Sequence, residues 1–235
     1  MQPEGRSASP RGLVLFALGF RPFFLLAGVF AVVLMTLWVL AFAGNRDFEN
    51  YYDLIGWHSH EMIFGYAAAV IAGFLLTAVR NWTDIQTAGG PSLAGMAALW
   101  LAGRLVPFFP GTFPAWLIAT VDLAFLPALA VTLAIPLLLS GQRRNLIFLP
   151  LLGALVVADL MVHLELMGYA ENSARAGTFL ALNLVVLLIV IMGGRVIPFF
   201  TERALPGVVP KRWRTVEWSS PATVVAFLIA ELVLP

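Results

Sequence analysis

Two of the chain's three histidines, His58 and His60, lie together with Glu61 at the start of a long apolar run. Ionisable side chains at the mouth of such a run are costly unless they bind a partner, because the bilayer solvates charge poorly. Residues three or four apart share a helix face, so His58 aligns with Glu61, whereas His60 aligns with Phe64. One helix therefore cannot direct both imidazoles at one small ion. Either the first turn is not helical, or the two histidines serve different partners.

The third histidine, His163, follows Asp159 by one helical turn in a later apolar run. At this spacing a carboxylate can hold the second nitrogen of an imidazole and orient the ring for metal binding. Arg104 and Asp122 are further ionisable residues inside apolar runs, either functional or members of a structural ion pair. The chain has no cysteine, so a metal must be held by histidine, carboxylate, methionine or backbone oxygen.

Histidines without cysteine suit two kinds of cofactor. One is a haem held through imidazole between helices, with its propionates facing Arg104 or the aqueous edge, and the other is copper, which accepts imidazole and thioether. Gly65, Ala69 and Gly73 form a stripe of small residues along which a flat cofactor or a neighbouring helix can approach the backbone. For this stripe, close helix packing alone is the alternative.

The composition indicates an integral membrane protein. The chain is 60% hydrophobic and 11% charged, whereas soluble domains carry roughly a quarter charged residues. Apolar windows predict an all-α polytopic bundle that forms one transmembrane domain, residues 1–235. The six predicted spans cover residues 22–43, 58–79, 92–109, 114–139, 146–168 and 176–200, and a seventh apolar run, cut short, begins at Ala222. Residues 107–114 are expected to form a tight aromatic turn.

The distribution of lysine and arginine predicts a cytoplasmic N-terminus. With this orientation ten basic residues fall on the cytoplasmic side and two outside: Arg6, Arg11, Arg21, Arg80, Arg143, Arg144, Arg203, Lys211, Arg212 and Arg214 against Arg46 and Arg175. The histidines and most of the intramembrane charges then lie near the outer ends of their spans, at one depth where they can meet. A net charge of +1 without a basic patch argues against a nucleic-acid partner.

The sixth predicted span carries polar residues at the opposite end. Arg195 and Pro198 follow a glycine pair near the cytoplasmic end, where the proline frees a carbonyl and the glycines permit a kink. Arg195 is either functional or extends to the inner headgroups, and Arg21 near the first span is equally well explained as a surface anchor.

Three stretches of the chain resemble the signature blocks of the NnrS family: residues 19–24, residues 57–65 continuing to 73–83, and residues 194–201. Members of that family are bacterial inner-membrane proteins that contain haem and copper and are linked to nitric-oxide metabolism and nitrosative stress. The resemblance covers the whole chain and implies that it corresponds to the N-terminal portion of a longer protein of about twelve spans. His58, His60, Glu61, Arg21 and Arg195 match motif positions of the family.

Together, the residues and the resemblance predict a multi-pass inner-membrane protein with a metal site on the periplasmic side. Haem is the first expected cofactor of this site and copper the second. We expect His58, His60 and His163 to be metal ligands, with Glu61 and Arg104 as further cofactor contacts. Asp159, Asp122, Arg195 and Arg21 are expected to support the site or the fold. The expected partners are the bilayer, a small ligand such as nitric oxide, and a membrane redox partner.

Two other functions remain open at this stage. A proton-coupled transporter or channel would use the outer histidines and carboxylates as a gate, but beyond them the spans offer little except Thr132, Asn183 and Arg195 as a polar path. A structural or sensory subunit would hold no cofactor. Whether the protein is catalytic stays undecided, although the sequence shows no constellation for hydrolytic nucleophilic chemistry.

Overall fold

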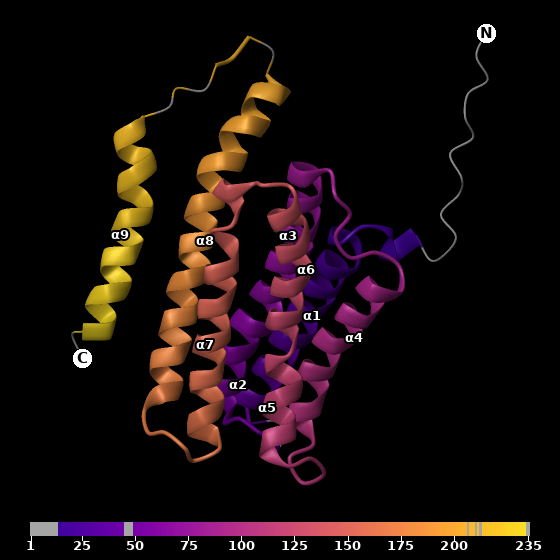
Figure 1. Ribbon diagram of the computed structural model, residues 1–235. Coiled ribbons are helices and arrows are strands. Elements are labelled where there is room, and N and C mark those ends of the chain that lie inside the picture. The colour runs from indigo at the N-terminus through magenta and orange to yellow at the C-terminus, as the bar shows by residue number, and fades with distance from the viewer. Residues whose placement is uncertain (1–13, 45–48, 206, 210, 212, 234–235) are drawn as a thin grey trace. The chain divides into compact units, whose positions relative to one another are not determined.

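The computed structural model describes residues 14–44, 49–205, 207–209, 211 and 213–233, and every regular element in this part of the chain is helical (Figure 1). The α-helices are α1 (Phe20–Phe42), α2 (Leu54–His60), α3 (Ala68–Thr83), α4 (Pro91–Leu105), α5 (Ala115–Leu123), α6 (Phe125–Leu139), α7 (Phe148–Leu166), α8 (Ser173–Ala204) and α9 (Arg214–Val233). The other helical elements in this part of the chain are the short 3-10 turns η1 (Val14–Ala17), η3 (Val106–Phe108) and η4 (Arg143–Asn145) and the π-helix η2 (Glu61–Ala67). The predicted all-α fold is confirmed.

Five stretches are long and apolar enough to cross a membrane, so the chain is a membrane protein. They are Phe20–Phe42, Leu54–Thr83, Ala115–Leu139, Arg143–Leu166 and Ser173–Ala204. These five match predicted spans, but the span expected at 92–109 is not among them, because α4 has only 15 residues before the chain tightens into η3. The predicted count of six full spans is therefore not confirmed. The run expected from Ala222 lies within α9, which begins earlier, at Arg214.

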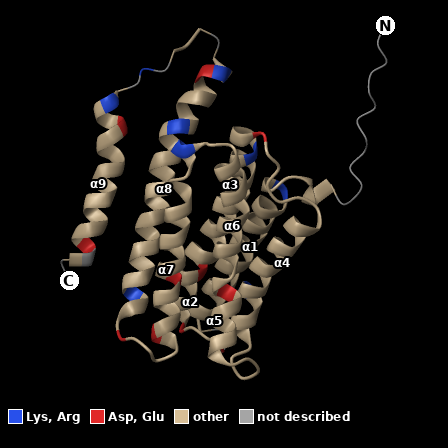
Figure 2. Cartoon of the chain, viewed as in Figure 1, with Lys and Arg blue, Asp and Glu red and all other residues tan. Residues whose placement is uncertain are grey.

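The chain forms two compact units, Met1–Leu149 and Pro150–Pro235, which are described separately. The prediction of a single domain over 1–235 stays a prediction. Basic residues cluster toward one end of α8, with one at the other end (Figure 2), and the predicted orientation stays a prediction. Arg6, Arg11, Arg46 and Arg212, which also entered that prediction, lie outside the described residues.

In the first unit, α3 packs against α1 across small residues. A side chain at Gly73 would meet the Phe24 ring at 2.8 Å and Phe23 Cβ at 3.1 Å, so the helices touch where the stripe of small residues predicted close approach. The Thr77 hydroxyl oxygen accepts a hydrogen bond from the Phe20 backbone N–H at 3.2 Å. These contacts fix α3, which continues the span that carries His60 and Glu61.

The loops at one end of this unit are also tied together. The predicted aromatic turn at 107–114 is present, with the Thr112 N–H donating to the Phe109 carbonyl at 3.0 Å. The Tyr51 N–H donates to the Pro107 carbonyl at 2.8 Å, which joins the segment before α2 to η3. The side chain of Asp53 caps α2 by accepting from the Gly56 N–H at 2.5 Å.

The second unit packs α8 between α7 and α9. A side chain added at Gly177 would collide with the Ala158 carbonyl oxygen, so α7 and α8 approach closely there. The Asn183 amide of α8 donates to Glu231 of α9 at 2.5 Å. Helix α8 continues through Pro198 to Ala204 without ending, and Arg195 lies within it.

Candidate metal centre

The helix that carries His60 changes its hydrogen-bonding pattern at the site. Helix α2 ends at His60, the π-helix η2 runs from Glu61 to Ala67, and α3 continues the span. A π-helical turn holds an extra residue per turn and is found frequently at functional sites. Glu61, the first residue of this turn, is 1% exposed, and His60 is also 1% exposed. Two ionisable groups are therefore buried side by side where the helix is irregular.

The two histidines of this stretch have different neighbours. The His58 ring stacks on Trp38 of α1 with centroids 4.1 Å apart, whereas the His60 ring lies 4.8 Å from Phe64 on its own span. The prediction that His60 aligns with Phe64 is confirmed, whereas the prediction that His58 and His60 do not face one ion stays a prediction. His58 as a metal ligand beside His60 stays a prediction without support from this geometry.

Arg104 joins two buried carboxylates that come from different spans. Its guanidinium lies 2.8 Å from Glu61 Oε2 and also forms an ion pair with Asp122 Oδ1. The Arg104 side chain is 4% exposed and the Asp122 side chain 2%. The expectation that these charges meet is confirmed within the first unit, where Arg104 forms ion pairs with both carboxylates.

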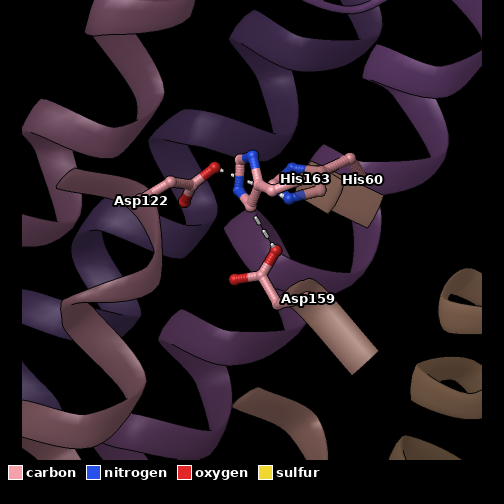
Figure 3. Close-up of side chains that lie close together, drawn as sticks. All are labelled: His60, Asp122, Asp159 and His163. Atoms are coloured by element: carbon pink, nitrogen blue, oxygen red, sulfur yellow. Dashed lines mark ion pairs between the residues drawn. The ribbon is translucent and has the colours of Figure 1, made fainter. Parts of the chain in front are cut away.

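His60 completes this network from the other side of Asp122. Its Nε2 lies 3.5 Å from Asp122 Oδ2 (Figure 3). Its Nδ1 lies 3.5 Å from Glu61 Oε1. One imidazole thus lies between two carboxylates that share a single guanidinium. When Glu61, Asp122 and Arg104 are ionised, their charges of −1, −1 and +1 leave a net −1 in the interior.

Small residues allow the charged groups to come this close. A Cβ at Gly65 would lie 2.5 Å from Glu61 Oε2 and 3.0 Å from an Arg104 nitrogen, and one at Gly103 would lie 3.1 Å from Asp122 Oδ1. The Gly65 carbonyl accepts a hydrogen bond from the Trp100 indole N–H at 3.0 Å. The stripe of small residues therefore serves the ion network as well as helix packing.

Tyr52 is the member of the network that the sequence did not reveal. Its hydroxyl donates to Asp122 Oδ2 at 2.9 Å and lies 3.2 Å from His60 Nε2. The side chain is 3% exposed, although Tyr52 belongs to the segment before α2. The available signal was weak: a tyrosine pair followed by a helix-capping Asp53, a few residues before the histidine motif.

The second unit holds the other predicted pair on α7. Asp159 and His163 lie on one helix face, with Asp159 Oδ1 3.6 Å from His163 Nε2 (Figure 3). Both side chains are buried. The predicted carboxylate–imidazole pair is confirmed, and a nearby carboxylate, Glu165, accepts from the Ala174 N–H at 2.7 Å and so caps the start of α8.

Arg21 lies at the start of α1 and Arg195 within α8. Arg21 donates to the Val14 carbonyl at 2.8 Å and is half-buried, which fits a support for the chain entering α1. Arg195 belongs to α8 in the second unit and has interactions of its own.

The donor set around His60 suits a compact metal ion. Imidazole with carboxylate oxygens is a ligand combination used by divalent copper, zinc, iron and manganese. A porphyrin fits less well at this imidazole, because the Tyr52 ring stacks on it at 4.6 Å, Phe64 lies at 4.8 Å, and carboxylates lie at both nitrogens. Haem bound through His60 would require these side chains to move.

A helical membrane protein with a buried histidine–carboxylate centre is the class that this fold and site define. The chain belongs to the NnrS family: the family model described as NnrS protein matches residues 14–235. The resemblance carried by the three motif blocks is thereby confirmed, and NnrS proteins are known to bind metal. No curated protein and no solved structure matches the chain.

Proposed function

We propose that the chain is an inner-membrane metal protein of the NnrS type, with a histidine-ligated metal ion near the periplasmic side and a role in nitric-oxide response or metabolism. His60 is the principal ligand from the first unit. His163 is the proposed ligand from α7, because the sequence places it near the outer end of its span, at the depth of His60. The Lys and Arg distribution supports this orientation.

The observation that carries the proposal is the buried donor set around His60, whose Nε2 lies 3.5 Å from Asp122 Oδ2 and whose Nδ1 lies 3.5 Å from Glu61 Oε1. When all are ionised, the two carboxylates outnumber the Arg104 guanidinium by one charge, and an uncompensated buried charge costs several kcal/mol. Asp159 is a third buried carboxylate, in the second unit. A cation bound at His60 would balance the charge of the first unit, which is the condition that stabilises buried acids in membranes.

Copper is the metal we propose first. It accepts imidazole and carboxylate ligands, ranks high in affinity among divalent ions, and needs no cysteine. When bound, copper would supply one-electron chemistry and a coordination position for a small ligand such as nitric oxide. Haem, which the family resemblance implies, fits poorly at His60 and is therefore proposed to bind at another site.

The chain's own residues would hold and orient that ion. Asp122 offers Oδ2 next to His60 Nε2, while its Oδ1 stays paired with Arg104. Asp159 orients the His163 ring from the same helix face, as second-shell carboxylates do for metal-bound histidines. Glu61 and Arg104 set the charge of the site. An electron donor in the membrane would be needed for any redox turnover.

The proposal is tested by measuring metal and haem content, with an absorption spectrum, on purified full-length protein before and after adding nitric oxide. We expect bound copper that is lost in His60→Ala and reduced in Asp122→Asn. His58→Ala is the matched control, because His58 lies in the same span but stacks on Trp38, and it should retain the metal.

Stoichiometry decides whether His60 and His163 share one ion. One copper per chain, lost in either His60→Ala or His163→Ala, supports a shared centre. Two ions lost independently would mean separate sites. A wild-type protein without copper, iron or haem would contradict the metal proposal. A Soret band that is lost in His60→Ala would show that His60 binds haem and not a compact ion.

A proton-coupled transporter is the second candidate, and one observation favours it. Thr132, one of the few polar residues predicted away from the outer end, lines an open surface pocket of about 200 Å³ together with Gln86, Thr87 and Ser92. Proton flux measured on protein in liposomes separates the two functions. Flux through metal-free protein would favour the transporter, whereas tight metal binding without proton flux would favour the metal protein.

A further inference from the structure

Tyr52 makes three contacts with the proposed ligands of the first unit. Its hydroxyl donates to Asp122 Oδ2 at 2.9 Å and lies 3.2 Å from His60 Nε2. Its ring stacks on the His60 imidazole with centroids 4.6 Å apart and planes tilted by 29°. A single side chain therefore fixes both the carboxylate and the imidazole at the point where they approach each other.

The donor roles at this point follow from the chemistry of the groups. An ionised carboxylate only accepts hydrogen bonds, and a phenol has one proton to donate. The Tyr52 proton is therefore directed at Asp122, and the phenol oxygen lies 3.2 Å from His60 Nε2, the nitrogen that binds the ion when it carries no proton. The hydrogen bond from the hydroxyl uses one lone pair of Asp122 Oδ2. A second lone pair of that oxygen can bind a cation.

The backbone delivers this hydroxyl from a fixed segment. The Tyr52 N–H donates to Asn50 Oδ1 at 3.1 Å, and the preceding residue, Tyr51, donates its N–H to the Pro107 carbonyl at 2.8 Å. Asp53, directly after Tyr52, caps α2. The tyrosine is thus held between two hydrogen-bonded neighbours, and its side chain is 3% exposed.

We propose that Tyr52 is a positioning residue of the metal centre, acting through Asp122 and His60 without binding the ion. This inference rests on the proposed function. Groups that orient metal ligands in this way typically contribute about 10- to 100-fold to metal affinity. Tyr52 is therefore expected to set both the affinity of the site and the geometry of its ligands.

The test compares Tyr52→Phe with wild-type full-length protein, using Cu²⁺ as the probe metal. Affinity is measured by competition with a chelator, and ligand geometry by electron paramagnetic resonance of the bound Cu²⁺. Tyr66→Phe, a half-buried tyrosine in η2, is the matched control. Asn50→Ala is a second variant, which keeps the hydroxyl but removes the acceptor of the Tyr52 N–H.

We expect Tyr52→Phe to bind Cu²⁺ about 10- to 100-fold more weakly and to change its resonance spectrum, whereas Tyr66→Phe matches wild type. Asn50→Ala should shift both readouts in the same direction by a smaller amount, which supports the inference even if Tyr52→Phe folds poorly. Unchanged affinity and spectrum in Tyr52→Phe would overturn it.

Two other outcomes would overturn the inference for different reasons. A phenolate-to-copper absorption band in wild type that disappears in Tyr52→Phe would make Tyr52 a direct ligand. Wild-type protein that binds no Cu²⁺ would remove the proposed function itself, and with it the role of Tyr52. If wild-type protein binds Cu²⁺ and Tyr52→Phe has the same affinity and spectrum, the role of Tyr52 is refuted but the proposed function stands.

Discussion

Replacing Arg104 with glutamine is expected to destabilise the protein strongly, because it leaves Glu61 and Asp122 buried without their shared cation. The side chains of these three residues are 4%, 1% and 2% exposed, respectively. Removing one partner of a buried ion pair typically costs about 3–5 kcal/mol. For a chain of this length, 1 kcal/mol corresponds to roughly 2–4 °C in Tm, so the expected decrease is about 6–20 °C.

The assay is thermal unfolding of the full-length protein in detergent, with a chelator present so that metal binding does not contribute. Arg144→Gln is the matched control, since Arg144 is exposed in the same unit. That substitution should change the free energy of unfolding by no more than about 0.5 kcal/mol.

A compensating variant separates charge from packing. Combining Arg104→Gln with Glu61→Gln and Asp122→Asn removes all three charges while nearly preserving side-chain volume. Neutral replacements of a buried ionic cluster are often tolerated, so this triple variant should be more stable than Arg104→Gln alone. The charge argument fails if Arg104→Gln melts like the Arg144 control, or if the triple variant melts below the single one.

Three further predictions concern packing, the second unit and topology. Gly65→Leu should prevent assembly, measured as loss of monodisperse protein in gel filtration, because a side chain there meets Glu61 and Arg104 atoms, whereas Gly95→Leu, with open space around it, should assemble normally. Asn183→Leu should lower the free energy of unfolding by about 1–3 kcal/mol by leaving Glu231 without its amide donor; equal stability would show that the contact is dispensable. A reporter inserted after Arg143 should be found in the cytoplasm, and an external location would overturn the predicted orientation.

The features predicted correctly from the sequence are those set by helical periodicity. The spacing of Asp159 and His163 predicts a shared face, and their side chains lie 3.6 Å apart. The same reasoning aligned His60 with Phe64 and separated His58 from His60. The common depth of Arg104, Glu61 and Asp122 was also predicted, but not which of them pair.

Other features depend on contacts that periodicity does not encode. Tyr52 precedes its helix, so no helical spacing relates it to Asp122, and its place depends on loop hydrogen bonds. The shortness of α4 was not foreseen either. Hydropathy continues past Leu105, but the chain tightens there into η3 at Pro107, so an apolar window overestimates the helix.

The π-helix explains how a charged site is accommodated within an apolar span. A π turn leaves the regular ladder of hydrogen bonds, and the backbone groups that it displaces need other partners. The Gly65 carbonyl accepts a hydrogen bond from the Trp100 indole N–H, 3.0 Å away. Gly65 is also where a side chain would strike Glu61 and Arg104. The irregular turn and its glycine thus act together, because the glycine leaves room for the ion pair, and the Trp100 indole donates to the Gly65 carbonyl beside the Ala68 backbone N–H.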